Sequence, residues 1–532
     1  MPFYTSILSQ PPPRSPSGFC SFEVISLPME PPLTIAPPAR AGRREWIGLA
    51  VLIFPTLLVS MDSTVTYLAL PAISAELKPT GSQLLWITDI YTFLEGGFLI
   101  IMGALGDRVG RKRLLMIGFI LFAAASIMAA FAGSPPWLIA ARALLGMTGA
   151  IILPCTLSLI RSLFHDDRQR TAAFGLYTAG YSGGTMLGPL IGGVLLTHFW
   201  WGSVFLISVP LMLLFFCASP LLPEYRDPDA KQFSLMNALL LLTGTLSVIF
   251  GVKRIAESGG MDWVALTTLL GGLGVSGVFV YSQTIVRNPL LNLSLFRIPA
   301  FSVTLSTLFL GLFCWAGLYL FLTQYMQLVL GYDPLKAGLL TLLPVGITVA
   351  GCILAPQTLR WVSRSVTILL GNVLMLGSIV LLAQLSTETN LILLITGFAG
   401  FNLGCGIVVT MGIDMVVSVA PHEQAGAASG ISESSTTFGQ AFGVALLGSV
   451  GTAVYRSKMF AFADTALSEE ARGTLGGALE ASKQLPVEAG LALANNARQA
   501  FVDSFHMASL LAAMAILIMI GVFVAVMKRN PK

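Results

Sequence analysis

Long apolar stretches recur along the chain, and short polar segments that carry most of the charged residues separate them. An apolar run of about 20 residues can cross a membrane as a helix. The pattern therefore predicts an all-α polytopic membrane protein. We expect spans at about 46–70, 84–105, 114–132, 137–160, 172–196, 201–222, 234–252, 264–286, 300–327, 336–358, 365–384, 391–416, 426–451 and 501–527, which makes fourteen.

The composition supports a membrane protein. Hydrophobic residues make up 55% of the 532-residue chain and charged residues only 11%, whereas soluble chains carry about 25% charged residues. The 53 glycines favour close helix packing in lipid. Five of the six cysteines lie in apolar runs, without the spacing of metal ligands. We therefore expect no metal site.

The basic residues predict the orientation of the spans. With the N-terminus inside, 20 of the 30 Lys and Arg residues fall on the cytoplasmic side, as the positive-inside rule requires. Both termini are then cytoplasmic, and the net charge of +4 needs no nucleic-acid partner. The proline-rich segment 1–44 has the composition of a disordered cytoplasmic tail.

An internal repeat divides the chain further. A shift of 255 residues aligns small residues of the fifth span with small residues of the thirteenth and lays spans 1–6 over spans 9–14. We expect an N-terminal six-helix bundle at 45–222, two inserted helices with their flanking loops at 223–299, and a C-terminal six-helix bundle at 300–527. A solvated outer loop occupies 452–500 of this bundle, and 528–532 forms a cytoplasmic tail.

The loop after the second span carries the sequence GALGDRVGRKRLL, residues 103–115. An acid at a helix end beside a basic cluster can form a lock between helices that breaks when the bundles rock. The alternative is a topology signal, for which positive charge alone suffices. The candidate lock residues are Gly103, Asp107, Arg108, Gly110 and Arg111.

This loop resembles the cytoplasmic loop motif of the major facilitator superfamily. The fourth span, AARALLGMTGAIILP, resembles the fourth-helix motif of that family, with Arg142 as its buried arginine. The fifth span, GGTMLGPLIGG, is similar to the GxxxGPxxGG motif of drug–proton antiporters. Its residues Gly184, Gly188, Pro189, Gly192 and Gly193 are expected to seal the two halves against proton leak.

The segments MDSTVTYLALPAI and LLWITDIYTF resemble the first two helices of the fourteen-helix branch that exports quaternary ammonium compounds and cationic dyes. The resemblance implies the major facilitator fold, with fourteen helices arranged as 6+2+6. It also implies transport driven by the proton motive force, without a cofactor, in the bacterial inner (cytoplasmic) membrane.

Acidic residues inside the spans are candidate sites, because a charge at the bilayer centre costs at least ~2.5–3.5 kcal/mol. The candidates are Asp62, Asp89, Glu95, Asp414 and Glu433. Only Arg142 is expected to offer a buried positive charge, so we expect most of these acids to lack a fixed cation. Such a carboxyl group can hold a proton and release it when a cationic substrate arrives.

Depth along the helices separates the first two acids. Asp62 lies about 24 Å along its span from Trp46, in the outer half of the membrane. Asp89 is near the outer start of its span, with Trp86 one turn away, and an aromatic ring beside a carboxylate suits a lipophilic cation. The alternative for Asp89 is an interfacial residue that caps the helix.

The remaining acids have equally open alternatives. Glu95 lies deeper and shares a helical face with Tyr91, so it either lines a cavity or is paired locally. Glu433 lies in the most polar run of any span, on a face that includes Gln440. Asp414 is near the inner end of its span, where an interfacial role remains open.

Polar and aromatic side chains of the ninth span are candidates for the opposite wall of a cavity, although packed or lipid-facing roles fit them as well. They include Tyr319 and Gln324.

The first functional hypothesis is a monomeric proton-coupled antiporter that exports lipophilic, mainly cationic drugs, dyes or biocides by alternating access. A second hypothesis keeps the fold and changes the cargo to an endogenous metabolite or a lipid-like compound. A third is a membrane sensor or scaffold that transports nothing. None of the three is an enzyme.

Overall fold

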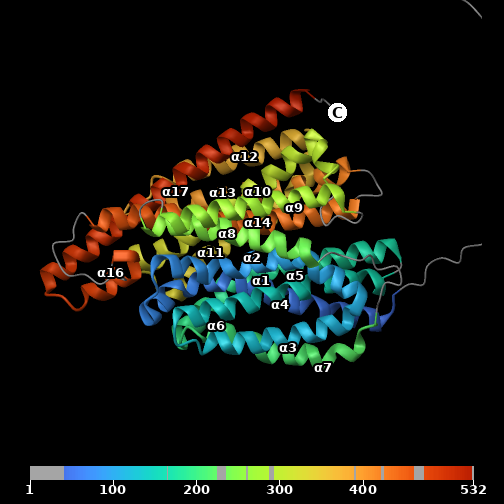
Figure 1. Cartoon of the computed structure of the whole chain (residues 1–532), viewed down its shortest axis with the longest axis horizontal. Coiled ribbons are helices and arrows are strands. Elements are labelled where there is room, and N and C mark those ends of the chain that lie inside the picture. The colour runs from blue at the N-terminus through green and yellow to red at the C-terminus, as the bar shows by residue number, and fades with distance from the viewer. Residues whose placement is uncertain are drawn as a thin grey trace, which may run out of the picture. The chain divides into compact units, whose positions relative to one another are not determined.

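The computed structural model describes residues 41–164, 166–224, 235–258, 262–286, 293–388, 391–420, 425–460 and 472–529. All secondary structure in these ranges is helical, as the apolar pattern predicts (Figure 1). The tail residues 1–40, including most of the expected disordered segment, lie outside the described ranges, and the first helix begins at Arg43.

The N-terminal half consists of α1 to α7 and a short 3-10 turn. Their bounds are α1 Arg43–Leu77, α2 Gly81–Val109, α3 Arg111–Ala130, α4 Pro135–Leu163, α5 Asp167–His198, α6 Ser203–Leu206, α7 Ser208–Ala218 and η1 Ser219–Leu221.

Two helices are inserted before the C-terminal half. They are α8 Leu235–Ser258 and α9 Trp263–Ile285, and the turn η2 Leu295–Arg297 follows them. The C-terminal half contains α10 Pro299–Gln324 with the π-helical turn η3 Tyr325–Val329, α11 Pro334–Thr358, α12 Arg364–Leu382, α13 Leu391–Val419, α14 Ala425–Phe460, α16 Leu475–Ser482 and α17 Val487–Arg529.

The two halves repeat the same helix pairs. α1 packs on α5 and α2 on α4, while α10 packs on α14 and α11 on α13. A Cβ on Gly184 or Gly188 would meet the backbone of α1, and a Cβ on Gly439 or Gly443 would meet the backbone of α10. These glycines are related by the shift of 255 residues, so the predicted repeat corresponds to the same close helix crossing in both halves.

Twelve helices in the described ranges are long and apolar enough to cross a membrane. α2 and α5 occupy the positions of the second and fifth expected spans but are not among the twelve. The chain is therefore a multi-pass membrane protein, and the count of fourteen spans stays a prediction.

The segment 452–500, which the sequence predicts to be a solvated loop with short polar helical stretches, is helical over most of its described part and is partly buried. α14 continues to Phe460, α17 begins at Val487, and α16 lies between them. Leu475 and Ala478 of α16 are buried. The reason is close packing, because a Cβ on Gly476 would lie only 2.9 Å from the Ser74 hydroxyl at the end of α1.

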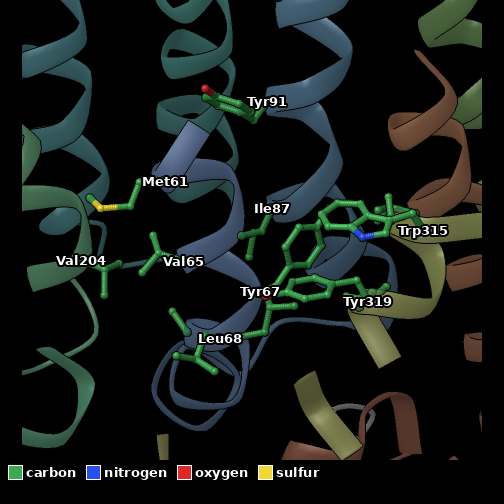
Figure 2. Close-up of a cluster of buried hydrophobic side chains, with 14 of the residues drawn as sticks. Met61, Val65, Tyr67, Leu68, Ile87, Tyr91, Val204, Trp315 and Tyr319 are labelled. Carbon is green, nitrogen blue, oxygen red and sulfur yellow. The ribbon is translucent and has the colours of Figure 1, made fainter. Parts of the chain in front are cut away.

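We call the helix ends near α16 the α16 side, which is the predicted outer side. On this side the two halves are in contact. The Gln327 side-chain amide donates to the Leu68 carbonyl at 3.0 Å, and the rings of Tyr67 and Tyr319 meet edge to face with centroids 5.4 Å apart (Figure 2). A Cβ on Gly193 of α5 would meet the Pro334 carbonyl of α11 at 2.9 Å.

Toward the other ends of α5 and α14 the packing is looser. No heavy atom lies within 4 Å of the Cβ position at Gly175, Gly183 or Gly430. Leu176 is 48% exposed. Each of these three glycines therefore directs its Cβ position into open space.

The inserted helix α8 lies along the seam between the two halves, against both α2 and α14 (Figure 1). Ile249 of α8 is buried in a cluster with Phe93 of α2 and Ala441 of α14. α9 packs on α8 and keeps large apolar side chains exposed, with Trp263 at 79%. α9 is thus a candidate lipid-facing helix, whereas α8 reaches the interior.

Candidate functional site

The first buried charge in the N-terminal half is Arg142 of α4. Its Nη1 lies 2.5 Å from Oδ2 of Asp62 on α1, and both side chains are almost completely buried. Its Nε donates to the Ile87 carbonyl at 3.2 Å, and its guanidinium lies 4.4 Å from the ring centroid of Tyr91. The expectation that Asp62 lacks a fixed cation is therefore wrong.

The second buried charge is Lys253 of α8, which the sequence analysis missed. Its Nζ lies 2.8 Å from Oδ1 and 2.7 Å from Oδ2 of Asp89 on α2. It also lies 3.8 Å above the ring centroid of Trp86. The expectation of a free Asp89 is wrong, and so is the capping alternative, because Thr80 is the N-cap of α2.

The sequence did not predict Lys253 as a buried residue, because the seventh span was expected to end at residue 252. In the structure α8 continues to Ser258. A signal was present in the sequence, since Lys253 follows the buried Ile249 by four residues and so shares its helical face. A lysine in phase with core positions at a span end can reach an acid in a neighbouring helix.

Glu95 of α2 and Glu433 of α14 belong to different halves and are close enough to interact electrostatically. Next to Glu95, a Cβ on Gly96 would lie 3.4 Å from the Thr437 Cβ, one turn after Glu433. Glu95 is 7% exposed, whereas Glu433 is open to solvent. Among the described residues, no lysine, arginine or histidine forms a salt bridge with either acid.

Tyrosines surround this pair of glutamates. The Tyr91 hydroxyl donates to the Val59 carbonyl at 3.3 Å and lies with Glu95 against the Gly149 backbone. Tyr177 and Tyr181 of α5 interact electrostatically with both glutamates. The site therefore combines two carboxyl groups from different halves with an aromatic wall, a combination that can bind protons or an organic cation.

Asp414 does not belong to this cluster. Its Oδ2 lies 2.9 Å from Nε of Arg364, and the two side chains are 44% and 47% exposed. An ion pair this exposed contributes little. Of the two roles that the sequence left open for Asp414, the contacts favour the interfacial one.

The ring faces of Trp86 and Tyr91 are covered by Lys253 and Arg142, so a ligand cannot stack on those faces. Tyr319 is buried against Trp315 and Tyr67 (Figure 2).

The two amide candidates lie apart from these rings. The Gln324 amide donates to the Leu320 carbonyl at 3.2 Å, and Gln440 is half-buried on α14. Of the proposed wall residues, Gln440 is the one that shares a helix with Glu433.

The loop between α2 and α3 is positioned by its glycines. Gly110 has a φ of 113°, which a residue with a side chain rarely adopts, and a Cβ on Gly103 would meet Pro154 of α4 at 3.7 Å. Arg111 is buried and donates to the Pro154 carbonyl at 3.4 Å, whereas Arg108 is exposed. The side chain of Asp107 lies outside the described residues, so the lock stays a prediction.

The glycine motif of α5 faces two different neighbours. A Cβ on Gly184, Gly188 or Gly192 would collide with α1 of the same half. A Cβ on Gly193 would collide with α11 of the other half, and the Pro189 carbonyl lies against Gly338 of α11. Gly193 and Pro189 therefore take part in the contact between the halves on the α16 side, and the sealing role that the resemblance implies stays a prediction.

These features define a helical membrane protein of two similar halves with paired and unpaired acids buried between its helices. A family model described as Major Facilitator Superfamily matches residues 52–444. The chain belongs to this superfamily.

Two relatives and one solved structure extend the match over nearly the whole chain. The multidrug efflux pump LfrA of Mycolicibacterium smegmatis is 35% identical over 483 residues, 90% of this chain and 95% of the relative. The methyl viologen resistance protein SmvA of Salmonella typhimurium is 32% identical over 499 residues, 91% of this chain and 99% of the relative. An inward-facing, unoccupied bacterial homolog of the human lysosomal transporter Spinster has a TM-score of 0.64 and 16% identity, covering 91% of this chain and 99% of the other, and so shows the fold alone.

Proposed function

We propose that this protein is a proton-coupled antiporter of the bacterial inner membrane that exports lipophilic, mainly cationic drugs, dyes or biocides by alternating access. The relatives support drug export, because one is a multidrug efflux pump and another is a methyl viologen resistance protein. Methyl viologen is an aromatic dication. The charge balance of the site supports the coupling to protons.

The observation that carries the proposal is an excess of acid over fixed positive charge where the halves meet. Glu95 interacts electrostatically with Asp62, with Glu433 and with a single guanidinium, that of Arg142, which also pairs with Asp62. If all three acids are ionised, two negative charges remain without a fixed cation, and the charge of Glu95 is buried. Such charges are neutralised by protons or by a bound cation. Protons and cationic substrate would therefore compete for this site.

The position of the two glutamates supports a coupling between this competition and movement. Glu95 belongs to the N-terminal half and Glu433 to the C-terminal half, so a rocking motion of the halves changes their separation. With the α16 side outside, as the basic residues predict, the exposed Glu433 faces the cytoplasmic half of the membrane. A cation from the cytoplasm would reach Glu433 first and Glu95 second.

The test is substrate-driven proton release from the purified protein in proteoliposomes, with ethidium and a bis-quaternary biocide as substrates. We expect the wild type to release protons when substrate is added. An imposed pH gradient should drive transport of the substrate in exchange for protons. Glu95→Gln and Glu433→Gln should each abolish the proton signal, because a glutamine holds no exchangeable carboxyl proton. Asp414→Asn, which removes an acid of the exposed ion pair, is the matched control and should transport normally.

Two outcomes would contradict the proposal. The absence of transport and proton release for every member of a broad cation panel would exclude the antiporter function. Full proton coupling in the Glu95→Gln, Glu433→Gln double variant would exclude the assigned site.

A further inference from the structure

Asp89 and Trp86 form a second site of the kind that binds an organic cation, and a side chain of this chain already fills it. The Lys253 ammonium contacts both carboxylate oxygens of Asp89 and lies 3.8 Å above the Trp86 ring centroid. A carboxylate with an aromatic face is the recognition chemistry for a lipophilic cation. Lys253 is 2% exposed and Asp89 is fully buried.

The cation comes from the inserted helix, outside the two repeated halves. Asp89 and Trp86 both belong to α2, whereas Lys253 belongs to α8. Among the described residues of α8, the buried ones other than Lys253 carry no charge, such as Asn237, Leu242 and Ile249. Lys253 is therefore the buried charged residue that α8 contributes to the interior among the described residues. Its ammonium pairs with the Asp89 carboxylate.

The neighbouring turn of α2 is occupied as well. Arg142 binds the Ile87 carbonyl and covers Tyr91, so two internal cations flank the segment from Trp86 to Tyr91. Beyond this segment α2 presents Glu95, for which no cationic partner is found among the described residues. On α2, the charge of Asp89 is thus neutralised by an internal cation, whereas Glu95 forms no salt bridge among the described residues.

We propose that Lys253 is a tethered occupant of a cation site formed by Asp89 and Trp86, and that it excludes soluble lipophilic cations from that site. Lys253 is then a specificity-determining residue, since it confines cationic substrate to the glutamates deeper in the seam. Only the statement that the excluded cation is a substrate rests on the proposed function. The cation site and its occupation by Lys253 do not depend on it.

The competing explanation is that the ion pair only anchors α8 to α2. Both explanations predict that loss of Lys253 lowers stability, so stability of the single variant does not separate them. They differ in what an added cation does. A freed cation site binds the ion and regains stability from it, whereas a lost anchor gains neither.

The experiment measures binding of tetraphenylphosphonium to the purified full-length chain by equilibrium dialysis. We expect Lys253→Met to bind one more ion per chain than the wild type, and the Asp89→Asn, Lys253→Met double variant to return to the wild-type number. Adding Trp86→Leu to Lys253→Met should weaken the new site by about tenfold through loss of the aromatic face. The same ion should raise the melting temperature of Lys253→Met more than that of the wild type.

Lys336 offers a matched control. Its ammonium also lies 3.8 Å above an aromatic centroid, that of Tyr332, but it is exposed and has no buried acid beneath it. Lys336→Met should therefore gain no binding. If Lys253→Met is not recovered in folded form, Lys253→Leu takes its place, because it also removes the ammonium from Asp89 and the expectations are unchanged.

An unchanged number of bound ions in the folded Lys253 variants would overturn the inference, as would a gain that persists after Asp89→Asn. A wild type that binds no cation, together with a gain in Lys253→Met, would contradict the proposed function and still support the tethered occupant. The experiment therefore tests the proposed function and the tethered occupant independently.

Discussion

The buried pair of Asp62 and Arg142 allows a quantitative prediction. Removing one partner of a buried ion pair leaves an uncompensated charge and lowers the free energy of unfolding by about 3–5 kcal/mol, whereas replacing both partners together is far less harmful. Asp62→Asn and Arg142→Met are the single changes. Arg142→Met additionally loses its charged hydrogen bond to the Ile87 carbonyl, a bond of about 1.5–3 kcal/mol.

The double variant isolates the pair. Like Arg142→Met, it lacks the hydrogen bond to the Ile87 carbonyl, but it no longer carries the unpaired Asp62 charge. We therefore expect it to be more stable than Arg142→Met alone. The coupling energy from the double-mutant cycle should be about 3 kcal/mol. The assay is reversible unfolding of the four proteins in one detergent, followed by tryptophan fluorescence.

An exposed pair provides the reference for this cycle. Lys483 and Glu480 lie 2.7 Å apart with side chains 71% and 36% exposed, so their coupling should be about 0–1 kcal/mol. A coupling for Asp62 and Arg142 no larger than this reference would refute the reasoning. It would mean that Asp62 is solvated or protonated in the folded protein, as the sequence alone suggested.

Three further results are expected. A disulfide between Gly96→Cys and Thr437→Cys should form on oxidation, because their Cβ positions are 3.4 Å apart and a disulfide needs about 3.5–4.5 Å. It should stop transport until reductant is added, since it ties the two halves together. Gly443→Ala should lower the free energy of unfolding by about 1–3 kcal/mol through overpacking, because the added Cβ would meet the Phe313 backbone. Asp262→Ala should lower the melting temperature, because the carboxylate accepts from the Ala265 N–H at 2.6 Å and caps α9.

Each of these results has its own control. Gly118→Cys with Ile151→Cys joins α3 to α4 within one half, with Cβ positions 3.3 Å apart, and should leave transport intact in the same cysteine-free background. If both disulfides stop transport, the loss is not specific to the seam and gives no support for movement there. Gly430→Ala has nothing within 4 Å of the new Cβ and should be neutral, so equal losses for the two alanines would contradict the packing argument.

The pH dependence of Asp262 checks the capping argument. The hydrogen bond from the Ala265 N–H, aided by Arg254, holds the pKa of Asp262 below its ordinary value of 3.8. A lowered pKa stabilises the fold fully above pH 3.8, and the contribution disappears as the pH falls through the lower, folded value. The difference in melting temperature between wild type and Asp262→Ala should therefore be constant at neutral pH and shrink only below pH 3.8.

The apolar periodicity was sufficient to predict the helices and the repeated glycine crossings. The resemblance to the fourth-helix motif implied that Arg142 is buried, and spacing along a single helix identified Glu433 as polar-faced. Periodicity along one helix could not identify partners on other helices. Asp62 and Arg142 are 80 positions apart, and Asp89 and Lys253 are 164 apart, so only the packing of helices reveals which acids are neutralised.

Lys253 also shows why hydropathy underestimates buried charge. A hydropathy window ends a span where charged residues begin, and it thereby assigns a terminal lysine to solvent. The side chain of lysine is long enough to turn back along its helix toward an acid. The Lys253 ammonium reaches Asp89 and lies over the Trp86 ring, so charged residues at the ends of spans belong in any list of candidate partners.

The neutralised acids sharpen the interpretation of those that remain. A buried acid with a fixed cation gains little from a proton, because protonation breaks an existing pair. Asp62 and Asp89 are in this position as the halves now stand, and only a movement of Arg142 or Lys253 would release them. Glu95 and Glu433 gain from either a proton or a cation, and they lie on opposite halves. Under the proposed function, the seam between α2 and α14 is therefore where a change in protonation and a change in conformation would act on the same two residues.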